Sequence, residues 1–162
     1  KSDEERAYYI NHEIDEIRGT IFRQTMFAEF EKMIHEHVEK GDALTVETFR
    51  TMYRSLLNDY FGPDVKVPDL LELECFRIPH FYNAFYVYKY ATGLSAAIAL
   101  ADRVLQGGKN ELDAYLAFLS AGCSKDPLDL LRDAGVDMER PDPVAAAMER
   151  FDTLVDELEK IL

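Results

Sequence analysis

Positive charge is scarce in this sequence and is not clustered anywhere along it. Among its 162 residues, 18 Lys and Arg side chains stand against 31 Asp and Glu side chains, for a formal net charge of −13 at pH 7. Nucleic acids and anionic membrane surfaces attract clustered positive charge, so we expect neither as a partner. Long apolar runs are also missing, since none approaches the roughly 18 residues of a membrane-spanning helix. No secretory signal pattern opens the chain, and we predict a soluble, intracellular protein.

Cysteine is rare as well. The sequence contains only Cys75 and Cys123, which lack the C-x-x-C spacing of thiolate metal sites. This spacing argues against both a disulfide framework and a cysteine-bound metal, and free thiols fit a reducing compartment.

No complete catalytic or metal-binding motif is present. A helical zinc peptidase site needs H-E-x-x-H, because that spacing aims two imidazoles at one metal. His12 and His35 are each followed by Glu, but Glu16 and Glu39 stand where the second His belongs. Each His and its Glu could form an exposed hydrogen-bonded pair, and the alternative is a solvated helix face. A ferritin-like di-iron bundle needs E-x-x-H, and no His here has Glu three residues before it, so this class is excluded. We therefore expect no metal ligand in this segment.

Strand-like alternation is absent too, and apolar residues recur at helical spacing throughout. The pattern predicts an all-α protein, a single helical domain over residues 1–162 with about seven helices. The first helix is either one long helix or two that are broken near Gly19. Proline and glycine set several of the other ends. The predicted helices span residues 3–39, 45–60, 70–76, 79–106, 110–119, 127–134 and 144–162.

Aromatic residues concentrate in one segment. Residues 77–93, here called the aromatic segment, hold four Tyr, two Phe and one His. Pro79 suits the first turn of a helix, so we expect one helix from about Pro79 to Gln106, with the phenols on adjoining stripes of its surface. His80 would lie in the first turn, where the helix dipole favours a neutral ring. The phenols either line a ligand site or belong to an amphipathic core helix whose Tyr tips reach solvent.

Three blocks of this sequence resemble the C-terminal part of the oligoendopeptidase F family, which is related to thimet oligopeptidase. The blocks are Arg18–Glu31 (RGTIFRQTMFAEFE), Ile78–Tyr82 (IPHFY) and Phe85–Gly93 (FYVYKYATG). The resemblance implies a mostly helical zinc peptidase that cleaves short peptides in the cytoplasm. It also implies that the zinc ligands, an H-E-x-x-H helix and a further Glu, lie upstream of this segment. The chain begins with Lys1 rather than Met, which also predicts a piece of a longer polypeptide.

The resemblance further implies roles for four residues of the aromatic segment. Tyr88 would donate to the oxyanion that develops at the scissile carbonyl, and His80 would hold a neighbouring substrate carbonyl. Tyr82 and Tyr86 would complete a substrate-binding wall, although Tyr86 and Tyr90 could instead only pack in the core. The expected partners are short peptides and the upstream zinc-binding part of the same polypeptide, and we expect the segment alone to be inactive. The alternative function is a non-catalytic helical module that binds a peptide or partner helix through its aromatic face.

Overall fold

The computed structural model describes residues 2–162, which form seven α-helices, two 3-10 helices and one π-helical turn. No strand occurs among these residues, so the predicted all-α class is confirmed. The chain divides into two compact units. Unit 1 combines the residues up to Ile21 with Thr92–Leu162, and unit 2 is Phe22–Ala91. That residues 1–162 act as a single domain stays a prediction.

The predicted first helix forms without a gap, but its middle turn is π-helical rather than α-helical. Helix α1 runs over Asp3–Ile17, the π-helical turn η1 over Arg18–Phe22, and helix α2 over Arg23–Glu39. The discontinuity expected near Gly19 is therefore a π turn rather than a broken helix. Such turns accommodate a local irregularity without ending a helix.

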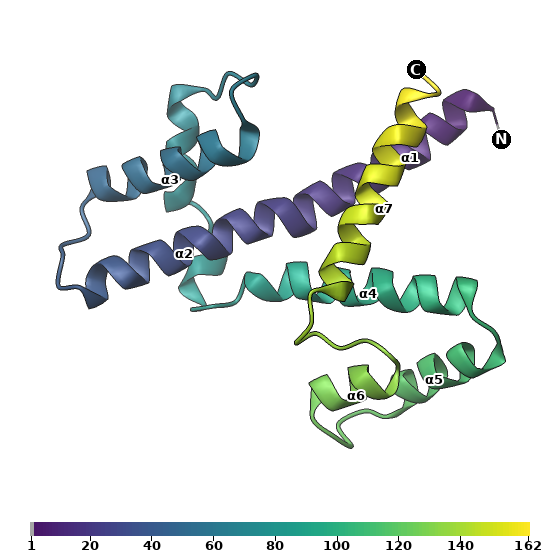
Figure 1. The fold of residues 1–162 in the computed structure, drawn as a ribbon. Helices are drawn as coiled ribbons and strands as arrows, with labels where there is room; N and C mark the ends of the chain where they lie inside the picture. The colour runs from purple at the N-terminus through teal and green to yellow at the C-terminus, as the bar shows by residue number, and fades with distance from the viewer. Residues whose placement is uncertain (1) are drawn as a thin grey trace. The chain divides into compact units, whose positions relative to one another are not determined.

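Unit 2 is built on α2 and α3, and α3 spans Val46–Phe61. Helix α3 packs against α2 and against the 3-10 helix η2, Asp69–Phe76 (Figure 1). A side-chain cap from Thr45 to the backbone N–H of Thr48 begins α3, as its sequence predicts. The buried core of the unit consists of Met26, Phe27, Phe30, Tyr53, Leu56, Leu57, Cys75, Ile78 and Val87.

Two buried carboxylates of η2 accept hydrogen bonds from side chains of α2 and α3. Glu74 accepts hydrogen bonds from Arg23 at 2.6 Å and from the Tyr53 hydroxyl at 2.8 Å. Glu72 accepts one from Arg50 at 2.7 Å, and this bond is the chief reason that its pKa lies below the ordinary value. A buried carboxylate is tolerated only when such partners are present. These bonds hold the chain just before it enters the aromatic segment.

The prediction of one helix from Pro79 to Gln106 is wrong. The 3-10 helix η3 covers only Pro79–Tyr82, and helix α4 begins at Tyr88 and ends at Gln106. Between them lies a loop, residues 83–87, in which Phe85 has a φ of +57°. An α-helix cannot contain that backbone angle, so the hydrophobic spacing does not extend the helix through residue 85.

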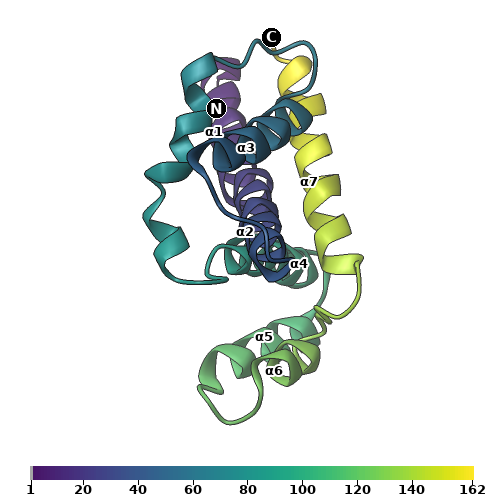
Figure 2. The same ribbon diagram turned by 90° about the vertical axis from the view of Figure 1, so that its left-hand side faces the viewer.

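Unit 1 contains α1, most of α4, α5 (Lys109–Ser120), α6 (Pro127–Asp133) and α7 (Asp142–Glu159). Helix α1 packs along α7, where Arg150 makes two 2.8 Å hydrogen bonds to Glu13 (Figure 1). Helices α5 and α6 lie side by side (Figure 2). Gly108 rather than Asn110 precedes α5, and α6 ends where Gly135 adopts a φ of +87°. Within residues 2–162, no helix combines the length and apolarity that a bilayer span requires.

Candidate functional site in the aromatic segment

His80, Tyr86 and Tyr90 form an aromatic cluster in unit 2. The ring centroid of His80 lies 5.8 Å from that of Tyr86 and 5.9 Å from that of Tyr90, and the two tyrosine rings are 5.4 Å apart. The three residues come from η3, the loop and α4, so the bend at residues 83–87 brings them together. On the single helix expected from the sequence, His80 and Tyr86 would be six residues apart and would lie on different faces.

The two phenols of the aromatic cluster are hydrogen-bonded to each other. The Tyr90 hydroxyl donates to the Tyr86 hydroxyl at 3.1 Å, and this bond is the main cause of the raised pKa of Tyr90. Because Tyr90 supplies the proton, the Tyr86 hydroxyl keeps its own proton for another acceptor. The Tyr86 ring also packs against the core of unit 2 and carries Lys89 Nζ 4.2 Å from its centroid. Tyr86 therefore has a packing role and an available donor at once.

The other two phenols of the predicted wall are exposed. Tyr82 is 87% exposed at the end of η3, and Tyr88 is 55% exposed at the start of α4. Of the four predicted residues, His80 and Tyr86 belong to the aromatic cluster, where their rings contact each other. Tyr90 is the member that was not among the predicted site residues, and its four-residue spacing from Tyr86 was the available signal.

His80 carries a buried nitrogen without a partner. Its Nδ1 atom is buried and makes no hydrogen bond to any residue among 2–162. Buried polar atoms nearly always have partners, so this nitrogen can bind a group that residues 2–162 do not supply.

The remaining polar candidates form no metal-binding cluster in the described part of the chain. No group of three or more His, Cys, Asp or Glu side chains in residues 2–162 is placed to hold a metal ion. Cys75 and Cys123 are both free, and burial is the main cause that raises the pKa of the Cys75 thiol to about 11. A thiol with so high a pKa is a poor nucleophile at neutral pH.

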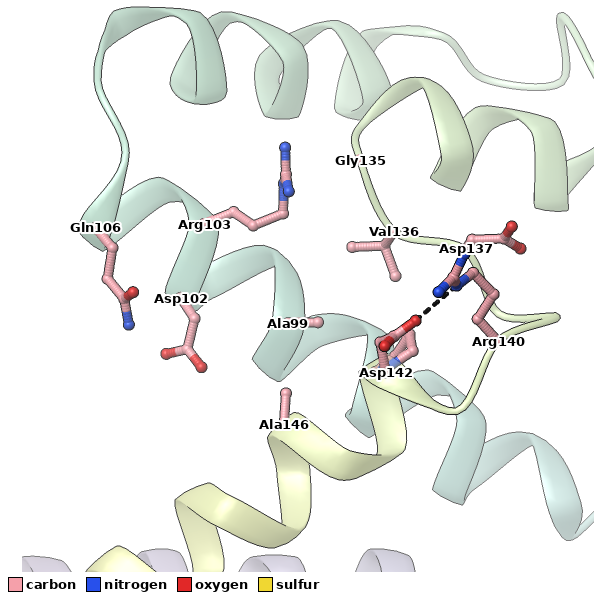
Figure 3. A pocket seen from close by; sticks show the side chains of 11 residues that line it. Ala99, Asp102, Arg103, Gln106, Gly135, Val136, Asp137, Arg140, Asp142 and Ala146 are labelled. Atoms are coloured by element: carbon pink, nitrogen blue, oxygen red, sulfur yellow. Dashed lines mark hydrogen bonds and ion pairs between the residues drawn. The ribbon is translucent and has the colours of Figure 1, made fainter.

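Unit 1 has a cavity of about 470 Å³ of its own, between α4, residues 135–137 and the start of α7 (Figure 3). Four of its five charged side chains are paired, two of them with residues outside the lining. Arg140 pairs with Asp142 at 2.8 Å, and Arg103 of α4 pairs with Glu111 at 2.6 Å. Both of its arginines are therefore held by carboxylates, and we assign no role to this cavity.

The family model for Peptidase family M3 matches residues 1–150. This chain belongs to peptidase family M3. Among M3 relatives, it is 46% identical over 162 residues to oligopeptidase PepF of Bacillus subtilis, covering 100% of this chain and 24% of that protein. It is 44% identical to a plasmid-encoded oligoendopeptidase F of Lactococcus lactis, covering 100% of this chain and 27% of that protein.

A solved M3 structure has the same fold. The crystal structure of oligoendopeptidase F from Enterococcus faecium superimposes with a TM-score of 0.95 at 43% identity, covering 99% of this chain and 31% of that chain. The chain thus spans about a quarter of the length of the curated relatives it matches. The family resemblance predicted from the three sequence blocks is confirmed.

Proposed function

We propose that this chain is the C-terminal part of a cytoplasmic, zinc-dependent oligoendopeptidase that hydrolyses short peptides. In this proposal it supplies the His and Tyr wall that binds substrate and stabilises the developing oxyanion. The observation that carries the proposal is the aromatic cluster of His80, Tyr86 and Tyr90, with Tyr82 and Tyr88 exposed beside it, in a chain of family M3. Phenols and an imidazole are suitable donors to carbonyl oxygens.

The exposed phenol of Tyr88 is assigned to the oxyanion, and His80 to a neighbouring substrate carbonyl. Tyr82 and Tyr86 are assigned to the substrate backbone. For Tyr86 the support is specific, because Tyr90 fills one of its acceptor positions and thereby orients the Tyr86 hydroxyl. Donors that are fixed before charge develops stabilise the transition state more than the ground state.

Family M3 enzymes are generally zinc-dependent, but the described residues of this chain do not fit a zinc site. Protein zinc sites take three or four ligating side chains, and no such cluster occurs within residues 2–162. We therefore assign the zinc ligands to another part of a longer polypeptide. The roles above concern only donors that this chain holds.

Replacing Tyr88 with Phe in the intact peptidase tests the proposal. Loss of one donor to an oxyanion typically costs about 2.7–4 kcal/mol, so we expect kcat/KM for a short peptide to fall roughly 100- to 1000-fold. Tyr8, which is exposed on α1, provides the matched control, and Tyr8→Phe should leave kcat/KM unchanged. If the Tyr88→Phe enzyme is as active as wild type, Tyr88 has no role in catalysis. An intact polypeptide without peptidase activity would favour the non-catalytic interaction module instead.

A further inference from the structure

Glu31 is a buried carboxyl group that no role described so far uses. It lies on α2, one residue after the fully buried Phe30, and is only 3% exposed. Glutamate is seldom buried to this extent without a polar partner. The partner here is a backbone group from far along the chain, since the Phe85 N–H donates to Glu31 Oε1 at 2.7 Å.

Phe85 has an unusual backbone conformation. With a φ of +57°, it is the only residue other than glycine with positive φ in the described range 2–162. A bulky residue seldom adopts the left-handed region unless its surroundings hold it there. Phe85 is 54% exposed, so core packing of its ring does not supply that restraint.

Helix α2 supplies the restraint at two points. Glu31 binds the backbone of Phe85, and His35 lies against its ring, with centroids 4.7 Å apart. Residues four apart share one face of a helix, so both groups reach the loop from the same side of α2. The loop is further closed by a hydrogen bond from the Tyr86 N–H to the Asn83 carbonyl at 3.1 Å.

The bend at Phe85 determines where the site residues point. His80 precedes it on η3, Tyr86 follows it directly, and Tyr88 begins α4. Val87, between the two tyrosines, is fully buried in the core of unit 2. A change of backbone direction at residue 85 would therefore rotate Tyr86 and Tyr88 relative to His80.

We propose that Glu31 is a positioning residue, which holds the left-handed bend at Phe85 and so fixes the orientation of Tyr86 and Tyr88 relative to His80. The proposal rests on the proposed function, because it names the residue that preorganises the same wall. Glu31 acts through the loop backbone and touches neither substrate nor metal. Its contribution should appear mainly in the orientation of Tyr88 toward the developing oxyanion, and so in kcat more than in KM.

Kinetics of the intact peptidase test this role. Glu31→Leu removes the acceptor, and we expect kcat to fall about tenfold or more, the factor that corresponds to one hydrogen bond to a charged group. Glu31→Gln keeps an amide oxygen in place and should retain most of the activity. Adding Phe85→Gly to Glu31→Leu should restore part of kcat, because glycine adopts the left-handed region freely. The matched control is Glu29→Leu, which removes an exposed carboxylate of the same helix that binds the Tyr60 side chain instead, and it should leave kcat unchanged.

Hydrogen exchange of the intact protein tests the bond without relying on activity. In Glu31→Leu the amides of residues 83–87 should exchange faster, while those of α3 stay protected. Should Glu31→Leu fail to fold, Glu31→Gln replaces it: its neutral amide oxygen is a weaker acceptor than a carboxylate, so the amides of residues 83–87 should exchange measurably faster than in wild type.

The outcomes separate the two proposals. Unchanged loop exchange in Glu31→Leu, or in Glu31→Gln where the first variant does not fold, would overturn the positioning role, and so would a loosened loop with unchanged kcat in Glu31→Leu. A wild-type protein that cleaves no peptide would overturn the proposed function, while faster loop exchange in Glu31→Leu would still support the contact between Glu31 and the loop.

Discussion

Replacing Tyr53 with Phe isolates one buried hydrogen bond in the support of the aromatic segment. Tyr53 is fully buried, and its hydroxyl donates to Glu74 at 2.8 Å. The ring would remain in place, since it packs against Phe30 and Phe27 with centroids 5.1 and 6.4 Å away. The free energy of unfolding should therefore fall by the value of a hydrogen bond to a charged group, about 1.5–3 kcal/mol.

Tyr60 provides the matched control on the same helix. Its hydroxyl also donates to a carboxylate, Glu29, at 3.0 Å, but Tyr60 is 37% exposed and Glu29 is exposed as well. Water replaces the lost partner at such a position, so Tyr60→Phe should change the free energy of unfolding by no more than about 0.5 kcal/mol.

Urea unfolding followed by far-UV circular dichroism measures both variants. Tyr53→Phe should lower the midpoint at an unchanged slope, because the surface exposed on unfolding stays the same. The two variants should differ by about 1 kcal/mol or more. If Tyr53→Phe is no more destabilising than Tyr60→Phe, the bond to Glu74 does not stabilise unit 2, and the argument that Glu74 holds η2 in place is refuted.

Two further measurements test the electrostatics and the metal assignment. Burial, then the bond to Glu29, raises the pKa of Tyr60 to about 12, and burial likewise raises the pKa of Tyr53. A tyrosine whose pKa is higher in the folded than in the unfolded protein stabilises the fold at pH values below its unfolded-state pKa of about 10. That stabilisation is lost as the pH rises through its folded-state pKa. The free energy of unfolding should thus fall between about pH 10 and 12. In a Tyr53→Phe/Tyr60→Phe double variant this fall should be smaller than in wild type. An equal fall in both proteins would refute the assignment of the pH dependence to these two tyrosines. Calorimetric titration of zinc into the 162-residue chain should show no site of micromolar or tighter affinity, because residues 2–162 hold no cluster of three ligands, and a tight site would contradict the upstream assignment.

The aromatic segment shows how far the sequence alone led toward the site. Its composition and its likeness to the family singled out His80, Tyr82, Tyr86 and Tyr88, whose roles stay predictions, and the structure brings His80 and Tyr86 into contact. Their mutual arrangement could not be read from spacing, because the structure bends at Phe85 where periodicity predicted a continuous helix. That bend depends on Glu31, which lies 54 residues earlier in the chain. A contact over such a distance in sequence leaves no local signal.

The sequence by itself determined the features that depend on residues close together in the chain, namely the fold class and several helix ends. Helical periodicity gave the all-α class, Thr45 gave the start of α3, and Gly135 gave the end of α6, because caps and hydrophobic stripes act within a few residues. Only the tertiary structure decided that the segment after Pro79 divides into η3, a loop and α4, and that Tyr90 joins His80 and Tyr86. The physical reason is that a buried carboxylate and a buried core stabilise a backbone conformation that local preference disfavours.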